Sequence, residues 1–252
     1  MVIRLENLCG GYGRKQVLFD INAEIKTGEI ISIVGANGCG KSTLLEIASG
    51  LMKPISGNVT VDGEDVHSME GKKRAKLISV LSQQKSPGVL TVRALVYHGR
   101  FPYLGYPRRY TDEDRQIVEE AMQTAGVSEF ADESLSELSG GQQQKAYIAM
   151  LIAQNTKIVY MDEPVTFLDI NYQLELMNLI KRMQKSGKTV IMVIHDLNLA
   201  MTYSDRIMAM KDGRLLNMGT PKEIYEKGVL GELFGIETHY SEKENQYFFK
   251  KL

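Results

Sequence analysis

The sequence of 252 residues lacks the features that mark membrane-spanning, secreted and nucleic-acid-binding proteins. Its longest apolar run, residues 146–153, is far too short to cross a bilayer, which takes about 20 residues. Lys and Arg total 30 and Asp and Glu total 31, so a net charge of −1 provides no basic field for a nucleic-acid partner. Cys9 and Cys39 are the only cysteines and cannot form a disulfide framework, which favours a reducing cytosol.

Internal repeats and low-complexity tracts are also not detectable in the chain. Its first residues, Met-Val-Ile-Arg-Leu-Glu, lack the basic and apolar regions of a secretory signal. A chain of this length can bury a sizeable core and lies near the upper size of one domain. We therefore expect a single globular domain over residues 1–252.

A glycine-rich segment is the most informative part of the sequence. It fits the pattern G-x-x-x-x-G-K-[ST] of phosphate-binding loops and reads Gly35-Ala36-Asn37-Gly38-Cys39-Gly40-Lys41-Ser42. The segment before it predicts a strand over 29–34, and the segment after it a helix over 41–49. Such a loop turns successive N–H groups toward one anion, and the helix directs its positive end at the same phosphates. We expect Lys41 to reach the β- and γ-phosphates and the Ser42 hydroxyl to bind Mg2+; the alternative is an ordinary glycine-rich turn.

The pattern of apolar and polar residues along the chain predicts strands in its first and last parts and helices between them. The predicted strands lie at 2–8, 17–25, 59–61, 77–81, 157–161, 189–194, 206–210 and 215–218. Helix signals dominate from 87 to 156, with Thr91 and Thr111 as N-caps. Strands that alternate with helices after a phosphate loop favour an α/β fold with a parallel sheet. Two β-containing portions, 1–85 and 157–252, therefore flank a helical insert, 86–156.

Two further helices are predicted after the insert, a long amphipathic one over 170–185 and a short one over 221–226. In the long helix, apolar residues recur at helical spacing and are expected to face the core. They are Leu174, Leu176, Met177, Leu179, Ile180 and Met183.

Two carboxylates, Asp162 and Glu163, end the apolar strand-like segment 158–161. On their own they would be weak evidence, because strands commonly end in charged residues. Downstream of a phosphate loop, the arrangement places Asp162 in the Mg2+ shell beside Ser42. Glu163 then lies where it can polarise an attacking water.

Two adjacent glycines precede the helix-like stretch 143–154, in the segment Leu138-Ser139-Gly140-Gly141-Gln142. Glycines that open a helix leave N–H groups unpaired and provide a second anion site. Ser139 is also a good N-cap, so an ordinary capped helix start explains the same residues equally well.

Taken together, these motifs make the chain resemble the ABC-type ATPases over nearly its full length, with residues 138–142 matching that family's signature loop. The resemblance implies a phosphate-loop (RecA-like) core with an N-terminal antiparallel β portion and an inserted helical subdomain. It also implies ATP and Mg2+ as cofactors. Two copies would form a head-to-tail dimer, with each ATP between the phosphate loop of one copy and the signature loop of the other.

The resemblance assigns roles to further residues, one at a time. Tyr12 matches the aromatic residue that stacks on adenine, although it could be a simple turn tyrosine. Gln83 matches the glutamine that contacts Mg2+ and the attacking water; Gln84 adjoins it, and we prefer Gln83 because it follows Val80-Leu81-Ser82. His195 matches the histidine that contacts the γ-phosphate and helps to hold Glu163. Asp169 matches the aspartate that reaches across the dimer.

The implied site is therefore larger than any one motif. The catalytic residues are Glu163, His195, Gln83 and Lys41, and the metal ligands are Ser42, Gln83 and Asp162. The residues that contact nucleotide are Tyr12, Gly35, Ala36, Asn37, Gly38, Cys39, Gly40, Lys41, Ser42, Thr43, Ser139, Gly140, Gly141, Gln142 and Asp169.

Three positions depart from the commonest family pattern without removing a catalytic group. Val165 stands where threonine is frequent, and Lys145 where arginine is frequent. Cys39 occupies a variable position of the phosphate loop, and we expect it to make the enzyme sensitive to thiol reagents.

A narrower resemblance, to the ATP-binding subunits of bacterial and archaeal importers, rests on the segments 91–96, 99–103, 167–175 and 195–200. It implies a dimer docked on a polytopic permease at the cytoplasmic face of the membrane, fed by a substrate-binding protein. Iron–siderophore complexes are the expected cargo, with haem, cobalamin and zinc or manganese as alternatives.

Two alternatives come from other classes of protein. A non-transport ABC ATPase of translation or DNA repair usually carries two cassettes, a long coiled coil or a basic surface, and the sequence has none of these. A scaffold that binds ATP without hydrolysing it would lack Glu163, Gln83 or His195, yet all three are present.

Overall fold

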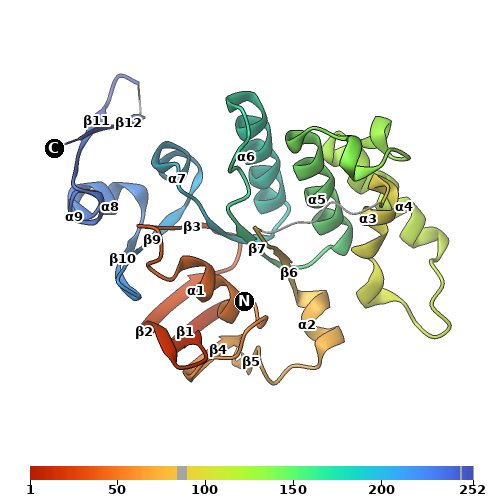
Figure 1. The fold of residues 1–252 in the computed structure, drawn as a ribbon, viewed down its shortest axis with the longest axis horizontal. Helices are drawn as coiled ribbons and strands as arrows, with labels where there is room; N and C mark the ends of the chain where they lie inside the picture. The colour runs from red at the N-terminus through yellow and green to blue at the C-terminus, as the bar shows by residue number, and fades with distance from the viewer. Residues whose placement is uncertain (84–89, 245, 252) are drawn as a thin grey trace.

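A six-stranded sheet crosses the computed structural model, which describes residues 1–83, 90–244 and 246–251 (Figure 1). Its strand order is β10-β9-β3-β8-β7-β6. The strands are β3 (Ile30–Gly35), β6 (Ile78–Leu81), β7 (Ile158–Asp162), β8 (Thr189–Val193), β9 (Arg206–Lys211) and β10 (Arg214–Gly219). All neighbours pair in parallel except β10, which runs antiparallel to β9. Every residue of β3, β7 and β8 is buried, as expected of a parallel sheet covered on both faces.

A second, antiparallel sheet is built mainly from the first part of the chain, in the order β2-β1-β4-β5. Its strands are β1 (Val2–Tyr12), β2 (Lys15–Lys26), β4 (Ser56–Val61) and β5 (Glu64–Asp65). Helix α1 (Lys41–Ala48) lies between this sheet and the six-stranded one (Figure 1). Apolar side chains from both sheets and α1, such as Leu18, Ile31 and Leu44, form one buried cluster there. The expected α/β fold with an N-terminal antiparallel portion is confirmed.

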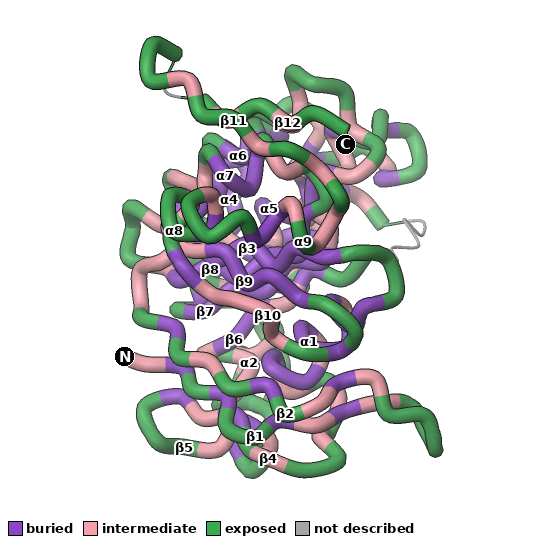
Figure 2. Tube along the Cα trace, turned by 90° about the vertical axis from the view of Figure 1, so that its left-hand side faces the viewer, coloured by how far each residue is buried: buried purple, intermediate pink, exposed green. Residues whose placement is uncertain are grey.

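Helices cover the other face of the six-stranded sheet, away from α1. The buried residues concentrate in the middle of the molecule, around this sheet (Figure 2). The covering helices include α6 (Ile170–Lys185), α7 (Leu197–Tyr203), α8 (Pro221–Glu226) and α9 (Val229–Phe234). The predicted core face of α6 is correct for Leu176, Met177, Leu179, Ile180 and Met183, all of which are buried. The prediction for Leu174 was wrong: its side chain is 40% exposed, because it lies off the face that these five residues share.

The described helices and turns between β6 and β7 form a helical segment, with one isolated β-bridge between Thr91 and Ser134. They comprise α3 (Val92–His98), α4 (Asp112–Ala125) and α5 (Gly140–Gln154), with the 3-10 turns η1 (Phe101–Tyr103), η2 (Ser128–Phe130) and η3 (Leu135–Glu137). Thr91 and Thr111 cap α3 and α4 as predicted, each accepting a hydrogen bond from a backbone N–H. The buried side chains of Arg100 and Asp114 form an ion pair with a 2.9 Å N–O distance.

Several elements were not predicted by the sequence patterns, among them α7, α9 and the two segments that follow. Helix α2 (Gly71–Leu77) has no buried residue and hence no apolar stripe. Strands β11 (Ile236–Ser241) and β12 (Gln246–Lys251) pair as a hairpin that extends from the body of the molecule (Figure 1). In the part of the chain that the structure describes, no helix combines the length and apolar character needed to cross a membrane.

Candidate functional site

The phosphate loop connects the end of β3 to the start of α1, as its sequence predicts. Gly40 occupies the N-cap of α1 with a φ of 101°, and a Cβ there would lie 2.7 Å from Leu18 Cδ2. No side chain caps α1, so the first N–H groups of the helix remain available to an anion. The ammonium of Lys41 donates to the carbonyl oxygens of Gly35 at 2.9 Å and Ala36 at 3.0 Å.

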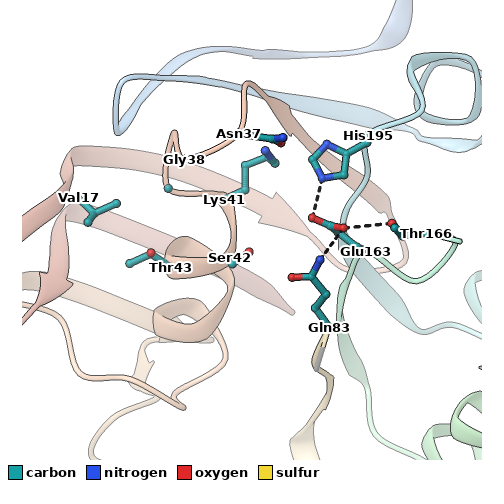
Figure 3. Close-up of a pocket in the computed structure, with 11 residues that line it drawn as sticks. Val17, Asn37, Gly38, Lys41, Ser42, Thr43, Gln83, Glu163, Thr166 and His195 are labelled. Carbon is teal, nitrogen blue, oxygen red and sulfur yellow. Dashed lines mark hydrogen bonds and ion pairs between the residues drawn. The ribbon is translucent and has the colours of Figure 1, made fainter. Parts of the chain in front are cut away.

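A cavity of about 550 Å3 opens beside this loop (Figure 3). It is lined by Val17, Asn37, Gly38, Gly40, Lys41, Ser42, Thr43, Gln83, Glu163, Thr166 and His195. The fold thus brings the loop together with the residues that follow β6, β7 and β8. The carboxyl ends of parallel strands meet at one edge of a sheet, where ligands of α/β proteins bind.

Glu163 is the centre of a hydrogen-bonded cluster in this cavity (Figure 3). One carboxylate oxygen accepts hydrogen bonds from the Gln83 amide at 2.8 Å and from the Thr166 hydroxyl at 3.1 Å. The other oxygen lies 2.6 Å from His195 Nε2. Glu163 itself has a φ of 51°, a conformation that costs a non-glycine residue about 1–3 kcal/mol and is typical of functional sites.

Asp162 has the properties expected of a ligand for a hard cation. Its side chain is buried, and Oδ1 has no hydrogen-bond partner among the described residues. Burial raises the pKa of the Asp162 carboxyl, the Ser42 hydroxyl opposes this shift with a hydrogen bond, and the charge of Glu163 adds to it. An oxygen that is buried and unpaired is costly unless a cation or water satisfies it.

The residues present therefore fit Mg2+. No cluster of three or more His, Cys, Asp or Glu side chains suited to a metal occurs among the described residues. Mg2+ does not need such a cluster, because it usually takes one or two protein oxygens together with substrate phosphates and water. Asp162, Ser42 and the side-chain oxygen of Gln83 would be its protein ligands, while the amide nitrogen of Gln83 donates to Glu163.

Other predicted site residues do not line the cavity in this chain. The side chain of Tyr12 is 53% exposed, and its hydroxyl donates to Glu46 at 2.7 Å. Residues 139–142 lie at the start of α5, and Asp169 caps α6. Gln84, the alternative to Gln83, lies outside the described residues.

Ser139 acts as the N-cap that the alternative interpretation of its segment predicts. Its hydroxyl accepts from the N–H of Gln142 at 3.3 Å, while the Gln142 side chain accepts from the N–H of Ser139 at 2.8 Å. Gly140 is exposed beside this cap, and a Cβ there would meet open space. The cap and an anion site are compatible, because the cap takes only one of the four free N–H groups of a helix start.

Two residues of the cavity were missed by the sequence motifs. Thr166 contacts Glu163 because the chain turns back on itself after β7, and only its spacing of three residues from Glu163 could have indicated this. Val17 enters from β2, far away in sequence, and no local signal marks it.

A family model described as ABC transporter matches residues 18–166, more than half of the chain. This match includes the phosphate loop, residues 138–142 and the pair Asp162 and Glu163. The chain belongs to the ABC transporter family. It is an ATP-binding cassette, and the cassettes of this family are ATPases.

Curated relatives of this ABC cassette carry names that specify iron chelates. It is 41% identical over 236 residues to the ferric enterobactin transport ATP-binding protein FepC of Escherichia coli (strain K12), covering 93% of this chain and 87% of FepC. It is 40% identical over 247 residues to the petrobactin import ATP-binding protein YclP of Bacillus subtilis (strain 168), covering 97% of each.

Solved structures have the same fold as this cassette. One, described as a metal-chelate type ABC transporter in an inward-facing conformation, matches with a TM-score of 0.83 and 25% identity over 100% of this chain and 97% of the other. The dimeric structure of the bacterial ABC transporter cassette MJ0796 matches with a TM-score of 0.77 and 33% identity, covering 87% and 98%. Cassettes of this family thus form dimers.

Proposed function

We propose that this protein is the ATP-hydrolysing subunit of an importer for ferric siderophores. The supporting observation is its identity of 40–41%, over nearly the full length, to ATP-binding subunits named for ferric enterobactin and petrobactin. The sequence identity to the subunits named for two different chelates is nearly equal. It therefore supports ferric siderophores as the class of cargo and does not single out one siderophore. Importers of haem, cobalamin, or zinc and manganese are the alternatives within the same family.

The arrangement of anion sites favours action as a head-to-tail dimer. The cavity holds the phosphate loop, while the signature loop opens α5 outside the cavity lining. One chain would therefore carry two anion sites that do not line one cavity. In the proposed dimer, the phosphate loop of one copy and residues 139–142 of the other enclose each ATP, and Asp169 reaches across the interface.

Within each site, the reaction is attack of water on the γ-phosphate of ATP, which gives ADP and phosphate. The phosphate loop and Lys41 bind and orient the triphosphate. Glu163 accepts a hydrogen bond from the attacking water and polarises it. Gln83, Thr166 and His195 hold the Glu163 carboxylate in place. Mg2+, held by Ser42 and Asp162, would neutralise charge on the β- and γ-phosphates.

The chain would act at the cytoplasmic face of the membrane as a peripheral subunit. The expected partners are a polytopic permease, which provides the path for the cargo, and indirectly a substrate-binding protein. ATP binding would close the dimer, the helical segment from α3 to α5 would transmit the movement to the permease, and hydrolysis would reopen the dimer.

Affinity purification tests this proposal. Tagged Glu163→Gln protein is isolated from detergent-solubilised membranes with ATP and Mg2+, and its partners are identified by mass spectrometry. We expect a permease in near-equal amount, and depletion of the chain should stop uptake of radioactive iron supplied as siderophore complexes. Recovery of only ribosomal or repair proteins would contradict the transport function, and loss of haem or cobalamin uptake alone would contradict the cargo class.

A further inference from the structure

The aromatic ring of Tyr172 packs directly against a glycine of the signature loop. Tyr172 lies in the first turn of α6, and Gly141 lies in the first turn of α5. A Cβ built on Gly141 would approach three ring carbons of Tyr172 at 2.5, 2.6 and 2.8 Å. Real Cβ atoms do not come this close, so the ring occupies the space that any larger residue would need. At the neighbouring Gly140, by contrast, a Cβ would meet nothing within 4 Å.

Lys145 holds the Tyr172 ring in this position. Its ammonium lies 4.9 Å from the ring centroid, within the range of a cation–π contact. The same ammonium forms an ion pair with Glu175, which lies three residues after Tyr172 on α6. The side chain of Lys145 is only 20% exposed. Lys145 therefore connects α5 to α6 through both the ring and the carboxylate.

The first turn of α6 is in turn fixed to Asp169. One carboxylate oxygen of Asp169 accepts hydrogen bonds from the backbone N–H of Asn171 at 3.0 Å and of Tyr172 at 3.1 Å. The Gln173 amide adds a bond to the Leu168 carbonyl at 3.0 Å. Tyr172, whose ring packs on Gly141, and Asp169, which is expected to reach across the dimer, thus belong to one hydrogen-bonded turn.

A surface groove lies beside this contact. A cavity of about 340 Å3 lies between α4, α5 and α6. It is lined by Gln123, Thr124, Ala125, Gly126, Lys145, Glu175, Leu176, Asn178, Leu179 and Arg182. At this surface groove, Tyr172 and Lys145 provide contacts that connect α5 to α6.

We propose that Tyr172 is a positioning residue that locks the signature loop to the Asp169 turn, with Lys145 holding its ring. In the dimer, both of these segments act on the nucleotide of the other copy. The lock makes them move as one unit, so that both reach the partner's ATP together. This inference rests on the proposed function, since it assumes the head-to-tail dimer.

The contact is made by ring carbons, which predicts how substitutions behave. Tyr172→Phe keeps the ring and should preserve the lock, whereas Tyr172→Ala removes it. Loss of the lock should lower kcat by about 10- to 100-fold, the effect of misplacing groups by about 1 Å. The affinity of the chain's own phosphate loop for a fluorescent ATP analogue should stay within about twofold, because Tyr172 does not line that cavity. Asn178→Ala, an exposed change on the same helix, is the matched control.

The decisive experiment compares kcat, analogue affinity and ATP-driven dimerisation, the last in the Glu163→Gln background. We expect Tyr172→Ala to lose kcat and dimerisation at unchanged affinity, while Tyr172→Phe and Asn178→Ala match the parent. Retention of both properties by Tyr172→Ala would overturn the inference, as would an equal loss of affinity. If Glu163→Gln alone stays monomeric with ATP, the dimer of the proposed function has failed instead.

A second variant covers the case in which Tyr172→Ala folds poorly. Lys145→Met leaves Tyr172 and Gly141 unchanged and removes the charge that holds the ring. It should lower kcat and ATP-driven dimerisation at unchanged analogue affinity, and parental values of both would contradict the proposed lock.

Discussion

His195 Nε2 lies 2.6 Å from Oε1 of Glu163, and this contact joins the ends of β8 and β7 at the candidate active site. A carboxylate offers about four lone-pair positions to donors. Gln83 and Thr166 take two of them, and a protonated Nε2 of His195 takes a third. One position then remains for water, and the three contacts fix its direction. A base held in this way needs little reorganisation when the substrate binds.

Asp162→Asn should abolish hydrolysis and stabilise the nucleotide-free protein. Burial raises the pKa of Asp162, so the folded state carries an unfavourable charge at neutral pH. This destabilisation is fully present above the folded-state pKa and disappears as the pH falls toward the unfolded value of about 3.9. Thermal unfolding should therefore show a Tm gain of a few degrees at pH 7 that shrinks in acid. A lower Tm at pH 7 would contradict this assignment.

Tyr12→Ala should weaken ATP binding by about 1–3 kcal/mol, the usual contribution of stacking on a base. Tyr12→Phe keeps the ring and loses the hydroxyl, with its hydrogen bond to Glu46, so its affinity should remain near that of the parent. Isothermal titration of both variants with ATP separates the two contributions. Equal losses in the two variants would assign the effect to the hydroxyl and remove the stacking role.

Cys39 should react slowly with alkylating reagents, although its modification should inhibit the enzyme. Its side chain is only 7% exposed, and burial raises the pKa of its thiol, which lowers the fraction of reactive thiolate. Cys9 is more exposed and should be labelled first. Mass spectrometry during reaction with iodoacetamide, together with ATPase assays of a Cys9→Ser control, tests this order. Modification confirmed at Cys39 with full activity would refute the predicted thiol sensitivity.

Arg100→Met should destabilise the helical segment by about 3–5 kcal/mol, because it leaves the buried carboxylate of Asp114 without its cationic partner. Arg100 also donates to the Ala153 carbonyl at 2.8 Å, so one side chain connects α5 to the start of α4. Burial opposes ionisation of Asp114, but hydrogen bonds from Thr111 and Arg100 outweigh it and lower its pKa. The stabilisation is thus present above the unfolded pKa and lost as the pH falls through the folded one. Urea unfolding at pH 7 and below pH 4 measures both effects, and an unchanged midpoint at pH 7 would contradict this role.

Local sequence patterns predicted most of the sheet and the phosphate loop because these features depend on short-range spacing. The loop of residues 35–42 and the pair Asp162 and Glu163 each follow a buried strand, and the parallel sheet then brings them to one edge. Helix α2 was missed because none of its residues is buried, so it has no periodic apolar face.

Contacts between distant residues could not be read in this way. Leu174 lies three residues before Met177, a spacing that suggested the same core face, yet it falls off the face that the five buried residues of α6 share and remains exposed. Thr166 reaches Glu163 through the backbone turn after β7, and Tyr172 reaches Gly141 through the packing of two helices. The motifs identify Gly141 but not the ring that requires it to be glycine.

The most direct test of this account is the behaviour of Glu163→Gln with ATP and Mg2+. The substitution keeps the size of the side chain and removes its negative charge, so binding should persist while turnover falls by about 10²–10⁴-fold. Size-exclusion chromatography with light scattering should then show a particle of twice the monomer mass that holds two ATP molecules, and a monomer when ATP is omitted. Near-parental hydrolysis by this variant, or a monomer saturated with ATP, would contradict the account.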